Sequence, residues 1–293
     1  MPPLALALVI AAALLHALWN IAAKKAGGGA HFMLIVAVTV VVLWSPVGLW
    51  FAWHAIPHWG LAEWGAVAAS AAVHVVYFST LLAGYRAADL TVVYPVARGT
   101  GPLLSSIGAV LLLSESMGAG GAAGVIAIAL GVFLIAGGPG LTRRARDPAQ
   151  RHRVALGIGW GSATGAAICA YTLIDGYAVK VLLISPILVD WMGHALRVPL
   201  MLPASLRDRA GFRPALHSQW RHALVVALLS PLAYVLVLYA VTIAPLSHVA
   251  PAREVSMLFA ALIGGHLLGE ADRAWRLLGA ACIAGGVVAL ALG

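Results

Sequence analysis

Ten stretches of mostly apolar residues follow one another along the 293-residue chain, separated by short connections. A helix of about 20 residues crosses the roughly 30 Å hydrocarbon core of a bilayer. The stretches cover approximately residues 3–23, 32–53, 62–84, 90–113, 119–137, 155–178, 184–204, 222–242, 246–268 and 274–292. The first lacks a basic leader and a small-residue cleavage site, so we expect a retained helix rather than a signal peptide. The sequence therefore predicts an all-α integral membrane protein with ten transmembrane helices.

Charged residues make up 10% of the chain and hydrophobic residues 62%, whereas a soluble domain carries about a quarter of charged residues. The formal net charge is +8. The excess of positive charge lies in short loops between the apolar stretches, where an anionic membrane surface explains it better than a nucleic acid does. The composition thus excludes a soluble enzyme and gives no support to nucleic-acid binding.

The distribution of Lys and Arg predicts the orientation, because basic residues in short loops stay in the cytoplasm. The loops after odd-numbered spans carry fourteen of these residues: Lys24, Lys25, Arg86, Arg143, Arg144, Arg146, Arg151, Arg153, Arg207, Arg209, Arg213, Arg221, Arg273 and Arg276. The loops after even-numbered spans carry only Lys180. We therefore expect the odd-numbered loops in the cytoplasm and both termini outside, in a protein of the cell inner membrane.

Residues separated by 155 positions match repeatedly, and several of the matches are charged. The pairs are Lys25 and Lys180, Ala97 and Ala252, Arg98 and Arg253, Leu112 and Leu267, Glu115 and Glu270, Gly124 and Gly279, and Gly131 and Gly286, while Asn20 falls on Asp175. Two apolar stretches aligned by chance would seldom match their scarce charges. The spacing predicts a first five-helix repeat over residues 1–137, a basic cytoplasmic linker over 138–154 and a second five-helix repeat over 155–293.

An odd number of spans in each predicted repeat has a topological consequence. After five crossings the second repeat enters the membrane from the opposite side. Many secondary transporters use such inverted repeats to build a central site with two alternating openings. The sequence therefore predicts two inverted five-helix repeats around a central cavity.

Three segments carry a resemblance to a known family: HALWNIAAKKAG at the end of the first span, YPVARGTGPLLSSIGAVLLLSE along the fourth and APAREVSMLFAALIGGHLLGE along the ninth. They resemble the EamA type of the drug/metabolite transporter superfamily, in particular YddG-type aromatic amino-acid exporters. The resemblance covers nearly the whole chain and implies ten helices, two five-helix repeats and a cavity that exports small metabolites without ATP. Many ten-helix members are thought to keep both termini in the cytoplasm, in contrast to the charge distribution here.

Arg98 and Arg253 lie inside the fourth and ninth predicted spans, where an arginine costs on the order of 3 kcal/mol near the helix centre. Each therefore needs a cavity or a polar partner. In one interpretation the guanidinium groups hold a substrate carboxylate or line a gate. In the other they fix broken helices by hydrogen bonds to free carbonyl groups, and the sequence leaves both open.

Proline and glycine surround both arginines. Such residues interrupt the backbone hydrogen bonds of a helix, which membranes tolerate where the backbone lines a cavity or is buried in protein. We expect the fourth and ninth spans to move during transport, with gating or hinge residues at Pro95, Gly99, Pro102 and Pro251.

Polar and aromatic side chains share faces of several predicted spans, as spacings of three and four residues indicate. With the two arginines they form the predicted substrate-binding set: His16, Trp19, Asn20, His74, Tyr77, Phe78, Tyr94, Arg98, Trp160, Tyr171, Asp175, Tyr234 and Arg253. An aromatic wall with a few polar groups suits small amphipathic molecules. Trp160 fits an interfacial anchor equally well, because Trp also gathers at membrane surfaces.

Acidic residues in or near the spans have two interpretations. Asp175 is either a protonation site that couples transport to protons or a structural cap near the outer end of its helix. In the seventh span the charges of Asp190, His194 and Arg197 are expected to neutralise one another. Glu115 and Glu270 fall at helix ends, where we expect caps or loop contacts.

The run GAGGAA over residues 118–123 matches a dinucleotide-binding pattern, but no strand precedes it. Gly120, Gly124 and Gly131 instead form a stripe of small residues, repeated by Gly279 and Gly286, which indicates close helix packing. The sequence contains no phosphate-binding loop, no metal-ligand spacing and no nucleophile motif. We therefore expect no ATP hydrolysis, no catalytic residues, no metal and no cofactor.

The favoured function is a secondary transporter that exports amino acids or related small amphipathic metabolites by alternating access. A flippase for lipid-linked sugars is an alternative that would need a lateral apolar entrance. An intramembrane enzyme is a further alternative, which would need clustered acids or a His-rich motif at one interface. The expected partners are a small-molecule substrate and the lipid bilayer, without nucleic acid, and the expected oligomeric state is a monomer.

Overall fold

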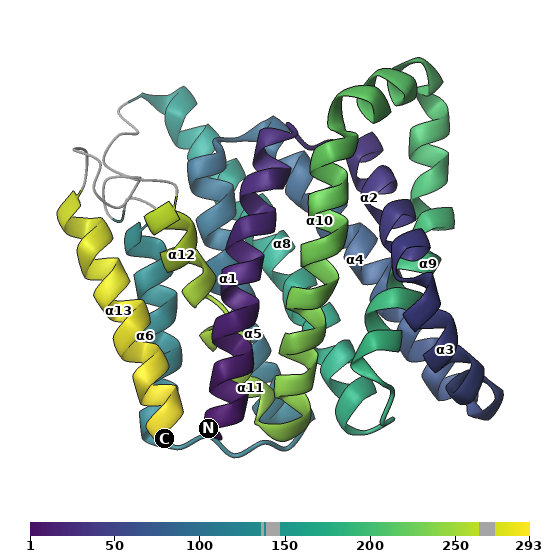
Figure 1. The fold of residues 1–293 in the computed structure, drawn as a ribbon. Helices are drawn as coiled ribbons and strands as arrows, with labels where there is room; N and C mark the ends of the chain where they lie inside the picture. Colours follow the sequence, from purple (N-terminus) through teal and green to yellow (C-terminus); the bar gives the residue numbers. More distant parts are fainter. Residues whose placement is uncertain (136–137, 139–146, 264–272) are drawn as a thin grey trace.

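The structure is a computed structural model that describes residues 1–135, 138, 147–263 and 273–293, and these residues form helices joined by short turns, without strands among them (Figure 1). The helices are α1 (Pro3–Lys25), α2 (Ala30–Leu43), α3 (Ser45–Ala55), η1 (Ile56–His58), α4 (Leu61–Ala87), α5 (Leu90–Leu112), α6 (Ala119–Ile135), α8 (Pro148–Lys180), α9 (Pro186–Arg207), α10 (Arg209–Ile243), α11 (Leu246–Ala252), α12 (Val255–Ile263) and α13 (Arg273–Leu292). The predicted all-α class is confirmed.

Six segments of the described chain are long and apolar enough to cross a membrane. They are α1, α4, α8, α10, the run α11–α12 and α13. Helices α2 and α3 together meet the same criterion as one span bent by 68°. Helix α6 is apolar but has only 17 residues, while α5 and α9 carry buried charged side chains. A multi-pass membrane protein is the architecture that these helices fit.

Two expected spans are divided in the backbone. The second bends at Trp44, where Pro46 occupies the first turn of α3. The ninth stops after Ala252, and Arg253 and Glu254 form a turn between α11 and α12. The predicted break in the ninth span is therefore confirmed.

The predicted break in the fourth span is wrong. Helix α5 continues through Pro95, Gly99 and Pro102. Membrane helices tolerate internal proline where neighbouring helices and Ser or Thr hydroxyls compensate the lost backbone bond. Nearby hydroxyls do bond to the helix's own carbonyl groups, as from Thr100 Oγ1 to Val96 O over 2.6 Å.

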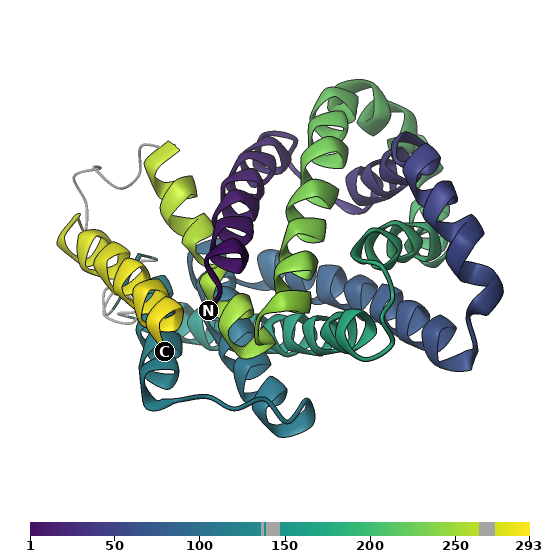
Figure 2. The same ribbon diagram turned by 60° about the horizontal axis from the view of Figure 1, so that its bottom comes forward.

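The helices pack in pairs that join distant parts of the sequence. Helix α1 lies beside α10, α4 beside α8, α5 against α8 and α6 against α13 (Figures 1 and 2). The largest buried apolar cluster lies between α1, α8, α9, α10 and α11 and includes Val9, Leu188 and Leu246. Pairs of helices from the two halves of the chain thus build the interior together.

Glycines fix the close approach of α6 and α13. A Cβ atom at Gly124 would lie 2.7 Å from the carbonyl oxygen of Gly286, and one at Gly131 would lie 2.6 Å from that of Gly279. Both distances are shorter than any normal contact, so a side chain at either position would push the helices apart. The helix packing predicted from the glycine stripe is confirmed.

Both ends of the described chain lie at the same end of the bundle, at the bottom of Figure 1. The Met1 amino group donates a hydrogen bond of 2.9 Å to the carbonyl oxygen of Ala291. At the opposite end, α8 begins at Pro148 with Asp147 capping it, so the end of the expected linker is helical. Several residues of the sequence predictions lie outside the described residues: Arg143, Arg144, Arg146, Leu267, Glu270 and most of the linker.

Candidate functional site

A cavity of about 160 Å³ lies between the two halves of the chain. Helices α1, α2, α4, α5, α8, α9 and α10 form its wall, together with Arg253 at the end of α11. Nine residues of the predicted substrate-binding set line it: His16, Trp19, His74, Tyr77, Phe78, Arg98, Tyr171, Tyr234 and Arg253. The shared faces of α1 and α4 therefore do converge on one space.

Four residues of the predicted set are absent from the lining: Asn20, Tyr94, Trp160 and Asp175. Asn20 turns back on its own helix, where its Nδ2 donates to the carbonyl of His16 over 2.8 Å. Asp175 lies one layer behind the wall, because it is fully buried and accepts a hydrogen bond from the Tyr234 hydroxyl. Its other carboxylate oxygen has no partner among the described residues.

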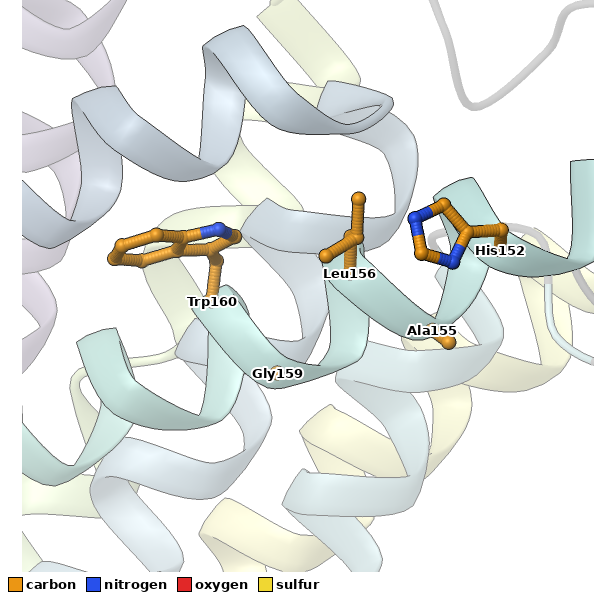
Figure 3. Close-up of a pocket in the computed structure, with 5 residues that line it drawn as sticks. All are labelled: His152, Ala155, Leu156, Gly159 and Trp160. Atoms are coloured by element: carbon orange, nitrogen blue, oxygen red, sulfur yellow. The ribbon is translucent and has the colours of Figure 1, made fainter. Parts of the chain in front are cut away.

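Trp160 lies beside a different depression, of about 440 Å³, which follows one side of α8 (Figure 3). All five residues that line this depression belong to α8: His152, Ala155, Leu156, Gly159 and Trp160. A depression formed by one helix cannot surround a solute on several sides, as a binding site must. The cavity lined by both halves is therefore the candidate site.

One wall of this cavity is an aromatic cluster around His74. The His74 ring stacks on Tyr171 with 4.0 Å between centroids, and Tyr234 and Tyr77 approach the same pair edge-on. The Nδ1 atom of His74 lies 2.9 Å from the carbonyl oxygen of Ser70. Because a carbonyl only accepts, Nδ1 carries the hydrogen there, which fixes the ring orientation.

Helix α9 adds three polar residues to the wall that the predicted substrate-binding set does not include. Asp190, His194 and Arg197 all line the cavity and are buried. Asp190 and His194 approach to 3.8 Å, and Arg197 Nε donates to the carbonyl of Gly193 over 2.9 Å. Mutual neutralisation, the expected role, is compatible with this contact, but the residues also face the space where a solute would lie. Their spacing along one face of a span was the feature of the sequence that could have indicated their place in the cavity wall.

A buried ion pair crosses from the first half of the chain to the second. Arg98 Nη2 lies 2.9 Å from Oε2 of Glu254 and 3.2 Å from the hydroxyl of Ser256. Glu254 is fully buried and occupies the turn between α11 and α12. This residue is missing from the sequence predictions. Glu254 could have been predicted from its position within a span, where a carboxylate needs a cationic partner.

At the end of the bundle that holds the termini, Glu115, between α5 and α6, contacts the start of α11 and the end of α8. Its carboxylate accepts hydrogen bonds from the backbone N–H groups of Leu246 and Ser247, at 2.7 and 2.8 Å, and pairs with Lys180 at 2.6 Å. The predicted loop contact of Glu115 is confirmed. Burial raises the pKa of the Glu115 carboxylate, but the bonds from Lys180 and the two N–H groups outweigh it, so the pKa lies below its ordinary 4.5.

The cavity extends toward the other end of the bundle. Its lining includes Ala23, near the end of α1, and Phe32 and Met33, near the start of α2. The connection between these helices lies opposite the termini (Figure 1). The two ends of the bundle are thus unequal, with the Glu115 contacts at one and the cavity reaching toward the other.

Comparison with known proteins finds a family match in the second half of the chain. Residues 156–292 match the EamA-like transporter family. The match supports the drug/metabolite transporter superfamily and indicates a membrane transporter rather than an enzyme. No curated protein matches the sequence.

A solved structure shares the fold of the whole chain. It is described only as "Crystal structure of protein" and superposes with a TM-score of 0.70 over 98% of this chain and 96% of that chain. The sequence identity is 15%, so the likeness concerns the fold alone.

Proposed function

Because residues 156–292 carry an EamA-like transporter domain, we propose that the whole chain is a secondary exporter of amino acids or related small amphipathic metabolites, of the YddG type. It works by alternating access, with ten membrane spans in two inverted five-helix repeats. Helices α5, α6 and α9, added to the seven apolar spans, bring the described segments to ten.

The packing of the helices supports the inverted repeats. A shift of 155 residues relates α1 to α8, α4 to α10 and α6 to α13. Helix α1 packs on α10, and its counterpart α8 packs on α4, the counterpart of α10. Contacts that exchange in this way are those that a two-fold axis produces.

Single residues follow the same exchange. Gly124 meets Gly286 and Gly131 meets Gly279, although the shift of 155 relates Gly124 to Gly279 and Gly131 to Gly286. Each glycine thus contacts the counterpart of the other. The axis that this implies runs through the contact between α6 and α13.

The observation that carries the proposal is the buried cavity lined by both halves, with three guanidinium groups and an aromatic wall in a bundle of apolar helices. Buried arginines in a membrane protein are costly unless a pathway or a ligand uses them. A cavity whose lining extends toward one end of the bundle, while Glu115 joins α8 and α11 at the other, fits one of the two states of alternating access.

The basic residues support the proposed orientation in the inner membrane. Lys24, Lys25 and Arg86 lie at the ends of α1 and α4, at the end of the bundle opposite the termini. Since basic loops stay cytoplasmic, the cavity in this conformation faces the cytoplasm and both termini lie outside.

Solute exchange in reconstituted liposomes tests the proposal. Liposomes that contain the purified protein are loaded with unlabelled L-phenylalanine, and entry of radiolabelled L-phenylalanine and of other amino acids is followed without ATP. We expect exchange above that of protein-free liposomes for at least one amino acid. Movement of a fluorescent lipid-linked sugar across the bilayer, without exchange of any amino acid, would contradict the proposal and favour the flippase.

A further inference from the structure

The two arginines related by the shift of 155 residues have different surroundings. Arg98 has two partners in the second half of the chain, the carboxylate of Glu254 at 2.9 Å and the hydroxyl of Ser256 at 3.2 Å. Arg253 forms no ion pair with any described residue, and its guanidinium forms no hydrogen bond with them. Its Nε is buried without a partner, as is that of Arg98, so the difference between the two lies in the terminal nitrogens of the guanidinium. The symmetry of the sequence is thus broken in the contacts.

The sequence explains the difference. Subtracting 155 from the positions of Glu254 and Ser256 gives Gly99 and Gly101. Glycine has no side chain, so neither position carries a polar group, and a Cβ at Gly99 would face Ala129 and Val132 of α6 rather than repeat the arrangement around Glu254. The first half of the chain therefore leaves one guanidinium without the carboxylate that its counterpart has.

Arg253 is nevertheless placed to bind a ligand. It is 5% exposed, and the exposed part lines the central cavity. Glu254 is its chain neighbour, but the Glu254 carboxylate pairs with Arg98. Arg197, the third guanidinium of the wall, lies within electrostatic reach of Asp190 and Asp175 and is bonded to Gly193. Asp175 and Glu254 lie within electrostatic reach of Arg253 too, but among the described residues Arg253 is the guanidinium of the cavity that has neither an ion pair nor a hydrogen bond.

A planar guanidinium matches a carboxylate in geometry and forms two parallel, charge-assisted hydrogen bonds with it. In a site of low polarity such a pair relieves the cost of a buried, unpartnered charge. The aromatic wall of His74, Tyr171 and Tyr234 is available to the apolar part of the same molecule.

We propose that Arg253 binds the carboxylate group of the transported molecule, in the place that Glu254 takes at Arg98, so that the substrate class is small aromatic or apolar carboxylates. Arg98 holds the break between α11 and α12 and does not bind substrate. The proposal deepens the proposed function and rests on it, because the carboxylate is that of a solute that crosses the membrane.

Ligand binding to the purified full-length protein in detergent tests the role of Arg253. Three probes share a phenyl ring: 3-phenylpropionate and L-phenylalanine carry a carboxylate, and phenethylamine does not. Binding is read from the fluorescence of the protein, since Trp19 lines the cavity. We expect the two carboxylates to bind roughly tenfold to hundredfold more tightly than phenethylamine, as for a charge-assisted hydrogen-bonded pair.

Variants separate the guanidinium from the rest of the site. Arg253→Gln should abolish the preference for carboxylates, and Arg253→Lys should retain part of it, because the charge remains without the planar fork. Arg153→Gln, at an exposed arginine, is the control and should bind as the wild type does. If Arg253→Gln fails to fold, the role of Arg253 is tested by comparing the preference for carboxylates in the wild type and in Arg253→Lys.

Two results would overturn the proposal: binding of phenethylamine as tight as that of the carboxylates, or an unchanged preference in Arg253→Gln. Failure of both carboxylates to bind would overturn it as well. Exchange of the three probes in liposomes distinguishes failure of the proposed transport function from failure of the carboxylate site. Binding without exchange contradicts the proposed function and leaves the carboxylate site, whereas equal exchange of phenethylamine contradicts the site and leaves the transporter.

Discussion

The guanidinium of Arg98 in α5 and the carboxylate of Glu254, between α11 and α12, form a buried ion pair with 2.9 Å between Nη2 and Oε2. The pair joins the two halves of the chain at the point where the ninth span breaks. Breaking one partner of a buried pair leaves the other charge uncompensated in a medium of low polarity. The pair is therefore sensitive to the substitution of either partner.

We expect Glu254→Gln to lower the free energy of unfolding by about 3 to 5 kcal/mol. The measurement is the thermal unfolding midpoint of the purified protein in detergent. Asp89→Asn is the control, because Asp89 and Arg153 form an exposed ion pair, for which the loss is at most about 1 kcal/mol. The double variant Arg98→Met, Glu254→Leu should recover part of the lost stability. Equal shifts of the unfolding midpoint in Glu254→Gln and Asp89→Asn would contradict this account.

Glycine packing between α6 and α13 gives a second expectation. Gly279→Ala places a Cβ 2.6 Å from the carbonyl oxygen of Gly131, so the helices must separate, at a cost of about 1 to 3 kcal/mol. Gly285→Ala on the same helix meets nothing within 4 Å and should be neutral or slightly stabilising. Unfolding midpoints of the two variants are compared, and a midpoint of Gly279→Ala at or above that of Gly285→Ala would show that the helices do not touch there.

The contacts of Glu115 depend on pH. Its folded-state pKa lies below the ordinary 4.5, so its ionised form stabilises the fold at neutral pH. That stabilisation is complete above the ordinary value and is lost as the pH falls through the lowered one. We expect wild-type protein to unfold at a higher temperature than Glu115→Gln at neutral pH, and the difference to shrink below pH 4.5. A difference that stays constant over this range would exclude the ionised carboxylate as its cause.

Transport should depend on the aromatic wall and not on the groove of α8. His74→Ala removes the ring that stacks on Tyr171, and we expect it to abolish solute exchange while leaving the protein folded. Trp160→Ala changes a residue outside the cavity lining and should keep most of the exchange. The initial rate of exchange in liposomes is the readout, with expression and gel-filtration profile as controls for folding. Slower exchange in Trp160→Ala than in His74→Ala would indicate that the site lies along α8 instead.

Accessibility labelling tests the orientation. Tags at either terminus should react with a membrane-impermeant reagent in intact cells, because the basic residues lie at the opposite end of the bundle. A cysteine introduced at Lys24 should react only after the cells are opened. Protection of both tags in intact cells would reverse the orientation.

The sequence was sufficient to locate the helices, because the bilayer imposes a strong constraint, but not their ends: α10 begins at Arg209 and includes Arg213 and Arg221, which were expected in a loop. A span needs a long apolar run, and every described helix except the short η1 overlaps one of the ten runs. The faces of α1 and α4 that line the cavity were equally accessible, because positions three and four residues apart share one side of a helix. Both inferences use only local spacing.

Glu254 was harder to predict, since its role comes from a partner distant in the sequence. Glu254 pairs with a residue more than a hundred positions away, and local spacing contains no information about that contact. Helix α5 shows the reverse error, where Pro95 and Pro102 indicated a break. Packing against α8 and α6 holds this helix together, and a single sequence does not reveal which neighbours a helix will have.

The amino group of Met1 and the carbonyl oxygen of Ala291 are 2.9 Å apart, so the described chain comes close to forming a ring. A short peptide would join the two ends without crossing the molecule. A circularly permuted chain that began at α8 and finished with α6 would bury the same surfaces as this one. The contacts between the helices therefore do not require either half to come first along the polypeptide.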